Sequence, residues 1–224
     1  MKVFRYIVIS IAVLILIFSA GYFLVGYYYN NTGNLNNTIS TTREAESEID
    51  TIIYSLEDPP SESLRGQIAT MSGEIYWQGR IATESSQIFD PQEILQGESV
   101  SIKKDSDLTI EFDNACIIEM SENTSVNVIQ TLPINLVFRQ SDGSAVFNRT
   151  GENPLSVRTL SLLSDINGKA KITIDKDKNT IYLEVISGST TVAYNDLEFI
   201  SRQMTIEENQ TYTFNQDTRK GVLR

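Results

Sequence analysis

The feature that most constrains this chain is a two-residue alternation of apolar and polar side chains that recurs from Leu108 to Phe214. A period of two places alternate side chains in a core and in water, which is typical of half-buried antiparallel strands. The sequence therefore predicts an all-β domain, either an antiparallel β-sandwich or a rolled sheet of successive hairpins. The apolar positions assigned to its core are Leu108, Ile110, Phe112, Cys116, Ile118, Met120, Leu136, Phe138, Ala145, Phe147, Ile172, Ile174, Ile181, Leu183, Val185, Val192, Tyr194, Leu197, Phe199, Met204, Ile206, Tyr212 and Phe214.

Polar turn residues separate these runs at intervals of about 8 to 12 residues, as in a sandwich or barrel. Asn167-Gly168 has the strongest hairpin signal, because both residue types tolerate the positive φ of a type I′ turn. Ser187-Gly188, Asp175 to Asn179 and Asn195-Asp196 are also predicted to be turns. No helical pattern follows Leu56. The β domain is therefore expected to span residues 66–224, enough for one substantial core.

An uncharged and largely aliphatic segment lies near the start of the chain, from Tyr6 to Tyr29. About 20 apolar residues are enough to cross the hydrocarbon core of a bilayer as a helix. A cleaved signal peptide has a shorter apolar stretch and ends in a small-x-small site, which Phe18-Ser19-Ala20 matches poorly. The sequence therefore predicts a transmembrane helix over residues 6–29.

Two basic residues, Lys2 and Arg5, are the only charges before this segment. The positive-inside rule then predicts a single-pass protein with a cytoplasmic tail at residues 1–5 and a periplasmic or extracellular C-terminal domain. The chain carries a net charge of −11, and without Lys2 and Arg5 the exported part carries −13. Nucleic acid and anionic lipid headgroups are therefore not expected as partners of that part.

Residues 30–65 are expected to form a flexible stalk that contains one amphipathic helix at about residues 42–57. Asn30 to Ser40 has little to bury. Thr41 or Thr42 can cap a helix, and Pro59 and Pro60 would end it. Its apolar stripe could dock on the β domain or join two copies of the chain into a homo-oligomer. That stripe consists of Ala45, Ile49, Ile52, Ile53 and Leu56.

The chain has one cysteine and no histidine. Cys116 alternates in phase with Ile118 and Met120, which predicts a small core residue. Lack of histidine removes the usual general base, the Ser-His and Cys-His dyads and most zinc sites. We therefore expect no enzyme activity, no catalytic residues, no cofactor and no metal site. A pair of carboxylates suited to glycoside cleavage stays open as an alternative, although no pair stands out.

Two short segments are candidates for binding sites. Asp175 to Asn179 has the alternating oxygen ligands of half a calcium loop, but Thr180 replaces the usual glycine and Ile186 the bidentate carboxylate, so a hairpin turn is expected. Tyr76, Trp77 and Arg80 are a candidate stacking platform for a sugar or peptide. Strand alternation would instead place one of the two aromatic side chains in the core.

Several short motifs follow one another in a fixed order over about residues 66–215. They are Gly73-Glu74-Ile75, Ile94 to Val100, Leu108 to Asp113, Thr124 to Val128, Asp142 to Phe147, Leu183 to Val192 and Met204 to Gln210. In order and spacing they resemble the FecR-type domain. The resemblance implies a bacterial, extracytoplasmic, all-β module, whose best-known members relay an outer-membrane signal to a cytoplasmic sigma factor. Here the predicted cytoplasmic tail is only five residues, too short to bind a sigma factor, so the resemblance implies a fold and a location but not the relay.

These observations together predict a membrane-anchored extracytoplasmic protein that serves as a binding or scaffolding module of the bacterial cell envelope. Its partner would be an envelope protein or a polysaccharide. A second hypothesis is a subunit of a cell-surface signalling system that works through a partner protein. A third is a wall-polymer hydrolase that uses paired carboxylates.

Overall fold

The computed structural model describes residues 58–224, which form strands joined by turns and short connections. The predicted membrane span at residues 6–29 and the predicted helix at residues 42–57 lie outside this part. Within it, no helix has the length and hydrophobicity needed to cross a bilayer. The domain from residue 58 onward is all-β, as the alternation predicts.

Sixteen strands belong to one hydrogen-bonded sheet in the described part. In chain order they are β1 (Gly66–Ser72), β2 (Ile75–Gln78), β3 (Ser86–Ile88), β4 (Glu93–Ile94), β5 (Ser99–Ile102), β6 (Asp107–Phe112), β7 (Cys116–Met120), β8 (Ser125–Leu132), β9 (Asn135–Asp142), β10 (Ser144–Arg149), β11 (Leu155–Thr159), β12 (Leu162–Asp175), β13 (Thr180–Asn195), β14 (Ser201–Glu207), β15 (Thr211–Asn215) and β16 (Lys220–Leu223).

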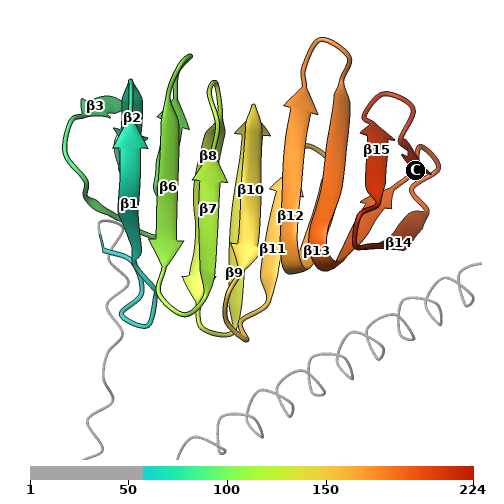
Figure 1. The fold of residues 1–224 in the computed structure, drawn as a ribbon, viewed down its shortest axis with the longest axis horizontal. Coiled ribbons are helices and arrows are strands. Elements are labelled where there is room, and N and C mark those ends of the chain that lie inside the picture. Colours follow the sequence, from blue (N-terminus) through green and yellow to red (C-terminus); the bar gives the residue numbers. More distant parts are fainter. Residues whose placement is uncertain (1–57) are drawn as a thin grey trace, which may run out of the picture. The chain divides into compact units, whose positions relative to one another are not determined.

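The long hairpin of β12 and β13 joins two layers of this sheet. The first half of β12 pairs with β11 and its second half with β10. In the same way, the first half of β13 pairs with β15 and its second half with β14. One layer therefore contains β4, β1, β6, β7, β10, β15 and β16, and the other contains β3, β2, β5, β8, β9, β11 and β14. The sheet curls so that the layers face each other, as Figure 1 shows.

A pair of glycines allows this hairpin to bend. Gly168 lies opposite Gly188 in the middle of the two strands, and the register shifts just beyond them, between Lys169 and Ala170. Both glycines have positive φ, +129° and +77°. The predicted turns at Asn167-Gly168 and Ser187-Gly188 are therefore wrong. A bulge or bend in a strand favours glycine for the same reason as a turn, because glycine adopts positive φ without strain. The glycines therefore mark a bend within the two strands and not a connection between strands.

The sheet is mixed, because β9 and β11 run parallel. The prediction of a purely antiparallel sheet is therefore wrong at this pair. The chain leaves β9 at Gly143, which has φ +70°, and enters the other layer as β10. It then returns through residues 150–154 and adds β11 beside β9 in the same direction. In the sequence, β10 of one layer therefore comes between β9 and β11, which pair directly in the other layer. Alternation within single strands does not reveal such a crossover.

The core lies between the two layers and contains most of the apolar positions that alternation assigned to it. Three phenylalanine rings join the layers: Phe138 of β9 lies with its ring centroid 5.3 Å from Phe112 of β6 and 6.3 Å from Phe147 of β10. Leu197, Phe199 and Met204 depart from the prediction because their side chains are exposed. The first two belong to a turn and the third to an edge strand.

Cys116 on β7 is fully buried, as predicted. Burial raises the pKa of its thiol to about 12, and the thiolate is the reactive form. We expect the native protein to show no reaction with Ellman's reagent at pH 8 over minutes, and one equivalent of thiol to react after unfolding in guanidinium. Reaction of the folded protein at the rate of a free thiol would contradict the position of β7 in the core.

Candidate functional site

The three residues of the predicted stacking platform are not on one surface. Trp77 packs against the core, and its Nε1 donates a hydrogen bond to Glu98 Oε2 at 2.9 Å. Tyr76 comes next to it on β2 and therefore faces the other way, where Lys103 Nζ lies 5.3 Å from its ring centroid. Arg80 lies against Gly97, where an added Cβ would come within 2.8 Å of its Cγ. Ligand binding by these three side chains stays a prediction.

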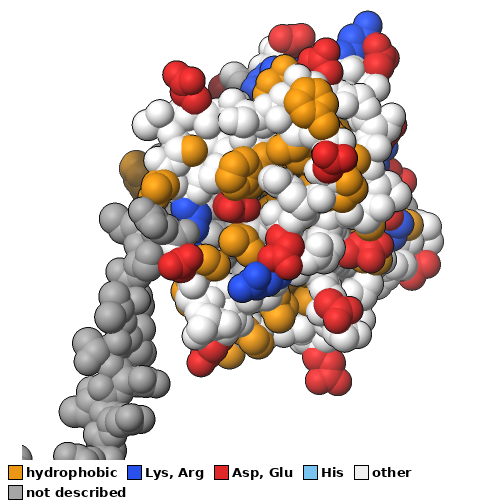
Figure 2. Space-filling view, turned by 90° about the vertical axis from the view of Figure 1, so that its left-hand side faces the viewer, with side chains coloured by type: hydrophobic (Ala, Val, Ile, Leu, Met, Phe, Trp, Pro, Cys, Tyr) orange, Lys and Arg blue, Asp and Glu red, His pale blue; other side chains and the backbone are white. Residues whose placement is uncertain are grey.

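The β1 to β4 side of the molecule carries an apolar patch. Figure 2 shows apolar side chains gathered there among polar ones, with acidic side chains at several points around them. The exposed residues of this region include Ile81 and Phe89, the latter 77% exposed. Phe89 of this patch is therefore a suitable control position for substitutions of other exposed apolar residues of the domain.

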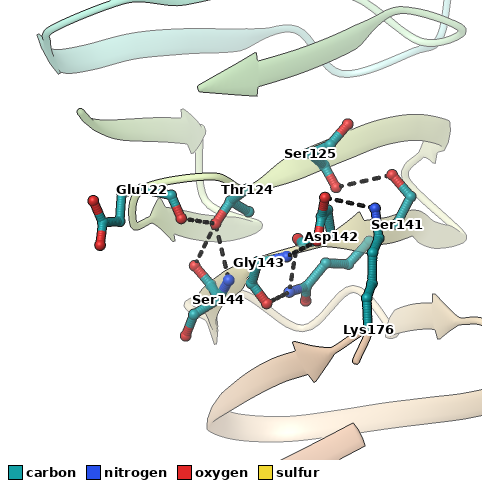
Figure 3. Close-up of polar contacts among 9 residues, drawn as sticks. Glu122, Thr124, Ser125, Ser141, Asp142, Gly143, Ser144 and Lys176 are labelled. Carbon is teal, nitrogen blue, oxygen red and sulfur yellow. Dashed lines mark hydrogen bonds and ion pairs between the residues drawn. The ribbon is translucent and has the colours of Figure 1, made fainter. Parts of the chain in front are cut away.

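A network of polar contacts holds the corner where β9 passes into β10, as Figure 3 shows. Thr124 Oγ1 accepts a hydrogen bond from Ser144 N and donates one to Ser144 O, both at 2.9 Å. The buried Gln140 donates from Nε2 to the carbonyl oxygens of Gly143 and Ile172, at 3.0 and 3.1 Å. At this corner, these side chains form hydrogen bonds with backbone groups that would otherwise lack a partner. Their role is therefore structural.

Replacement of Thr124 by valine tests this role. The variant keeps the shape of the side chain but leaves Ser144 N–H without its acceptor, so we expect a loss of about 1–3 kcal/mol in the free energy of unfolding. Urea denaturation measures it, with Ser125→Ala as the control, because the carbonyl of Ser125, and not its hydroxyl, takes part in the network. If Thr124→Val has the same free energy of unfolding as the parent, the hydrogen bonds at this corner do not contribute to stability.

The calcium-like segment is a hairpin turn between β12 and β13, as predicted. The carboxylate of Asp175 accepts hydrogen bonds from Lys178 N at 3.1 Å and Lys178 Nζ at 2.7 Å. The side-chain hydrogen bond from Lys178 lowers the pKa of Asp175. Among residues 58–224, no group of three or more potential ligand side chains is placed to hold a metal ion.

Four turns meet at one end of the two layers, and we call them the turn cluster: residues 160–161, 176–179, 196–200 and 216–219. Ser161 Oγ bonds to Gln216 Oε1 at 2.6 Å, and Gln216 N bonds to Asn179 O at 2.8 Å. Arg219 Nη1 donates to Asn195 O at 3.3 Å, which links the remaining turn. The bend at the paired glycines brings both ends of β13 to this cluster, because the strand folds back on itself.

The β13–β14 turn of this cluster presents apolar side chains to solvent. Leu197 is 65% exposed and Phe199 87% exposed, and Ile200 follows them. Phe199 has φ +60°, a conformation that bulky side chains rarely adopt. The turn is nevertheless well ordered by hydrogen bonds, which gives a fixed apolar tip at residues 197–200.

Asp196 orders that tip. Its carboxylate accepts hydrogen bonds from the backbone amides of Glu198 and Ile200, at 3.0 and 2.9 Å, and from Arg202 Nε at 2.9 Å. The amide of Ile200 is the main cause that lowers the pKa of Asp196. A lowered folded-state pKa means that the contribution of this carboxylate to stability is present above its unfolded-state pKa and is lost as the pH falls through the lowered value.

β14 is a free edge of the sheet in the described part, since it pairs only with β13. It has seven residues, of which only Ile206 is buried, and its pairing with β13 has no register shift. It contains neither proline nor glycine. The other edge strands β3, β4 and β16 have three, two and four residues. β14 is therefore the longest and most regular edge of the domain.

Sequence reasoning missed this site because it assigned Leu197 and Phe199 to the core. The alternation of Leu197, Glu198 and Phe199 resembles a strand when only polarity is counted. The signal against a strand was Asn195-Asp196 directly before it, since Asp commonly accepts hydrogen bonds from the backbone two residues on. A tip of only three residues between Asp196 and Ile200 is consistent with a short hairpin loop.

No protein-family model matches the chain, and no curated protein matches it. Two solved structures are similar to it, both crystal structures of a candidate anti-sigma factor from Parabacteroides distasonis ATCC 8503, at 1.65 and 2.50 Å resolution. Each is 14% identical in sequence, and the TM-scores are 0.49 and 0.48 respectively. The match covers 56% of this chain and 58% of that protein, a little over half of each.

Proposed function

We propose that the protein is a membrane-anchored extracytoplasmic module that binds a partner protein of the bacterial cell envelope through the β13–β14 hairpin. The observation that carries the proposal is the free, regular edge of β14 directly beside an ordered apolar tip. The predicted membrane span and the resemblance to the FecR-type domain support the extracytoplasmic location.

Strand addition explains how such an edge binds. In an antiparallel pair, alternate residues direct their backbone N–H and C=O groups to the neighbouring strand, so the rest of β14 directs them outward. Natural proteins usually shorten, bend or block an edge strand to avoid unwanted pairing. An extended segment of a partner can instead pair with it, and backbone hydrogen bonds then provide the affinity.

Site-specific cross-linking of the intact protein in its native membrane tests the proposal. A photoreactive residue, p-benzoylphenylalanine, replaces the exposed Thr205 of β14 in one variant and the exposed Glu111 of β6 in the control. β6 is paired on both sides, with β1 and β7, so it offers no free edge. We expect a defined protein adduct at Thr205 and none at Glu111. Equal adducts at both positions, or none at either, would contradict binding at the β14 edge.

Mass spectrometry of the adduct separates a scaffold from a signalling subunit. A partner with its own cytoplasmic domain would favour a signalling role. A partner confined to the envelope would favour scaffolding. Replacement of residues 6–29 by an unrelated membrane anchor provides a second readout, since a scaffold should keep its function and a subunit that signals through its span should lose it.

A further inference from the structure

Resting on that proposed function, we propose that the turn cluster is the surface that docks on the partner, with Leu160 and Phe199 entering an apolar pocket that has basic side chains at its rim. The partner is thus a protein that offers such a pocket beside the segment that pairs with β14. Four observations support this: backbone conformation, local order, position and charge.

The backbone conformation of the exposed apolar residues is unusual. Eight non-glycine residues in the described part have positive φ, and five of them are Asp or Asn, which tolerate it. The three others are Leu160, Phe199 and Arg219, and all three lie in the turn cluster. Leu160 and Phe199 are also exposed. Folding alone would favour glycine or asparagine at these positions, so strained and solvent-exposed apolar residues indicate a use outside the fold.

The tip is ordered before any partner binds. The three hydrogen bonds to the Asp196 carboxylate hold the loop that carries Phe199. Ser161, which follows Leu160, bonds to Gln216 with both its backbone amide and its hydroxyl. An apolar side chain on a rigid turn loses little conformational entropy on binding, which is the property of an anchor residue at an interface.

The turn cluster lies at the end of the described domain that is opposite to the point where the chain enters it. Figure 1 shows the start of the described chain near the lower end of the sheet, from which β1 runs upward, and the β12–β13 turn at the upper end. Leu64 N bonds to Thr131 O at 2.8 Å, near the end of β8 that lies away from the turn cluster. The chain thus enters the described domain at the end opposite to the turn cluster, so the cluster is not covered by the segment that leads into β1.

The charged side chains of the turn cluster indicate which charges should surround the pocket of the partner. Asp177, Glu198 and Asp217 lie in the turn cluster and form no ion pair within residues 58–224. Of the basic side chains in the cluster, Lys176 and Lys178 are paired with carboxylates, as is the neighbouring Arg202, whereas Arg219 forms no ion pair within the described residues. The unpaired charges of the cluster are therefore three acidic groups and one basic group. Carboxylates around an apolar tip favour a partner with lysine or arginine around its pocket and oppose anionic lipid headgroups.

The experiment uses the full chain in its native membrane, with p-benzoylphenylalanine at Leu197 as the probe of the tip and at Thr205 as the probe of the edge. The key variant is Phe199→Gly. Glycine relieves the strain of a positive φ, so this variant should unfold at the same temperature as the parent or higher. If Phe199 is an anchor, the same variant should reduce the yield of adduct at Thr205 at least about tenfold. Phe89→Ser, an exposed phenylalanine of the β1 to β4 side, is the matched control and should leave the yield unchanged.

Support requires that both probes capture one protein, that Phe199→Gly weakens capture without lowering stability, and that the cross-linked peptide of the partner carries lysine or arginine beside apolar residues. Capture at Thr205 that persists in Phe199→Gly, or that falls equally in Phe89→Ser, would overturn docking by the turn cluster and leave the proposed function standing. Capture at Leu197 of lipid or of a second copy of the chain would also overturn it. Failure of both probes to capture a protein would refute the proposed function together with the inference.

Discussion

Replacement of Phe138 by alanine should lower the free energy of unfolding by about 3–5 kcal/mol, as expected for a large aromatic side chain removed from a core. Phe138 contacts Phe112 and Phe147 of the opposite layer, so its removal opens a cavity between the two layers and not within one of them. The surrounding strands are held by hydrogen bonds on both sides, which limits how far they can collapse into the space.

Urea denaturation of the domain measures this effect. The matched control is Phe89→Ala, because that phenylalanine is 77% exposed and its removal should change stability by no more than about 0.5 kcal/mol. Similar losses in the two variants would show that the layers do not enclose a common core around Phe138.

Gly188→Ala should destabilise the domain by about 3 kcal/mol or more. An alanine there must adopt φ +77°, and its Cβ would lie 2.1 Å from the carbonyl oxygen of Asn167 on the paired strand. Strain of this kind costs about 1–3 kcal/mol, and the overlap with backbone adds to it because a strand cannot move aside as a flexible side chain can.

Ser187→Ala is the control for this substitution, since Ser187 is the exposed neighbour of Gly188 in the same strand. We expect it to change the free energy of unfolding by no more than about 0.5 kcal/mol. The midpoint and slope of denaturation distinguish the two variants. A Gly188→Ala protein as stable as Ser187→Ala would mean that the hairpin does not bend at the glycine pair.

The strands and the core could be predicted from the sequence because alternation is a local property. Phe112, Phe138 and Phe147 are buried as their phase required. The Asp175 to Asn179 turn was also predictable, because its polar residues interrupt two long apolar runs. Period-two reasoning works wherever one face of a strand is buried and the other is wet.

The path of the chain between layers could not be predicted in the same way. Gly168 carries a turn signal but lies at the bend of the long hairpin, next to a bulge, since a bend and a turn need the same backbone freedom. The parallel pairing of β9 with β11 depends on β10 crossing to the other layer, which is a long-range event. The tip was missed for a related reason: Phe199 has the phase of a core residue, and only its neighbours in space reveal that nothing covers it.

The entry of the chain at one end of the sheet, opposite to the turn cluster, has a mechanical consequence. A pull on the N-terminal side of the domain, resisted at the turn cluster, acts along the length of β1. Antiparallel hydrogen bonds lie perpendicular to their strands, so those between β1 and β6 share such a force and resist it together. A pull across the strands would break them one after another. The domain is therefore built to withstand tension between its point of entry and the far end of its sheet.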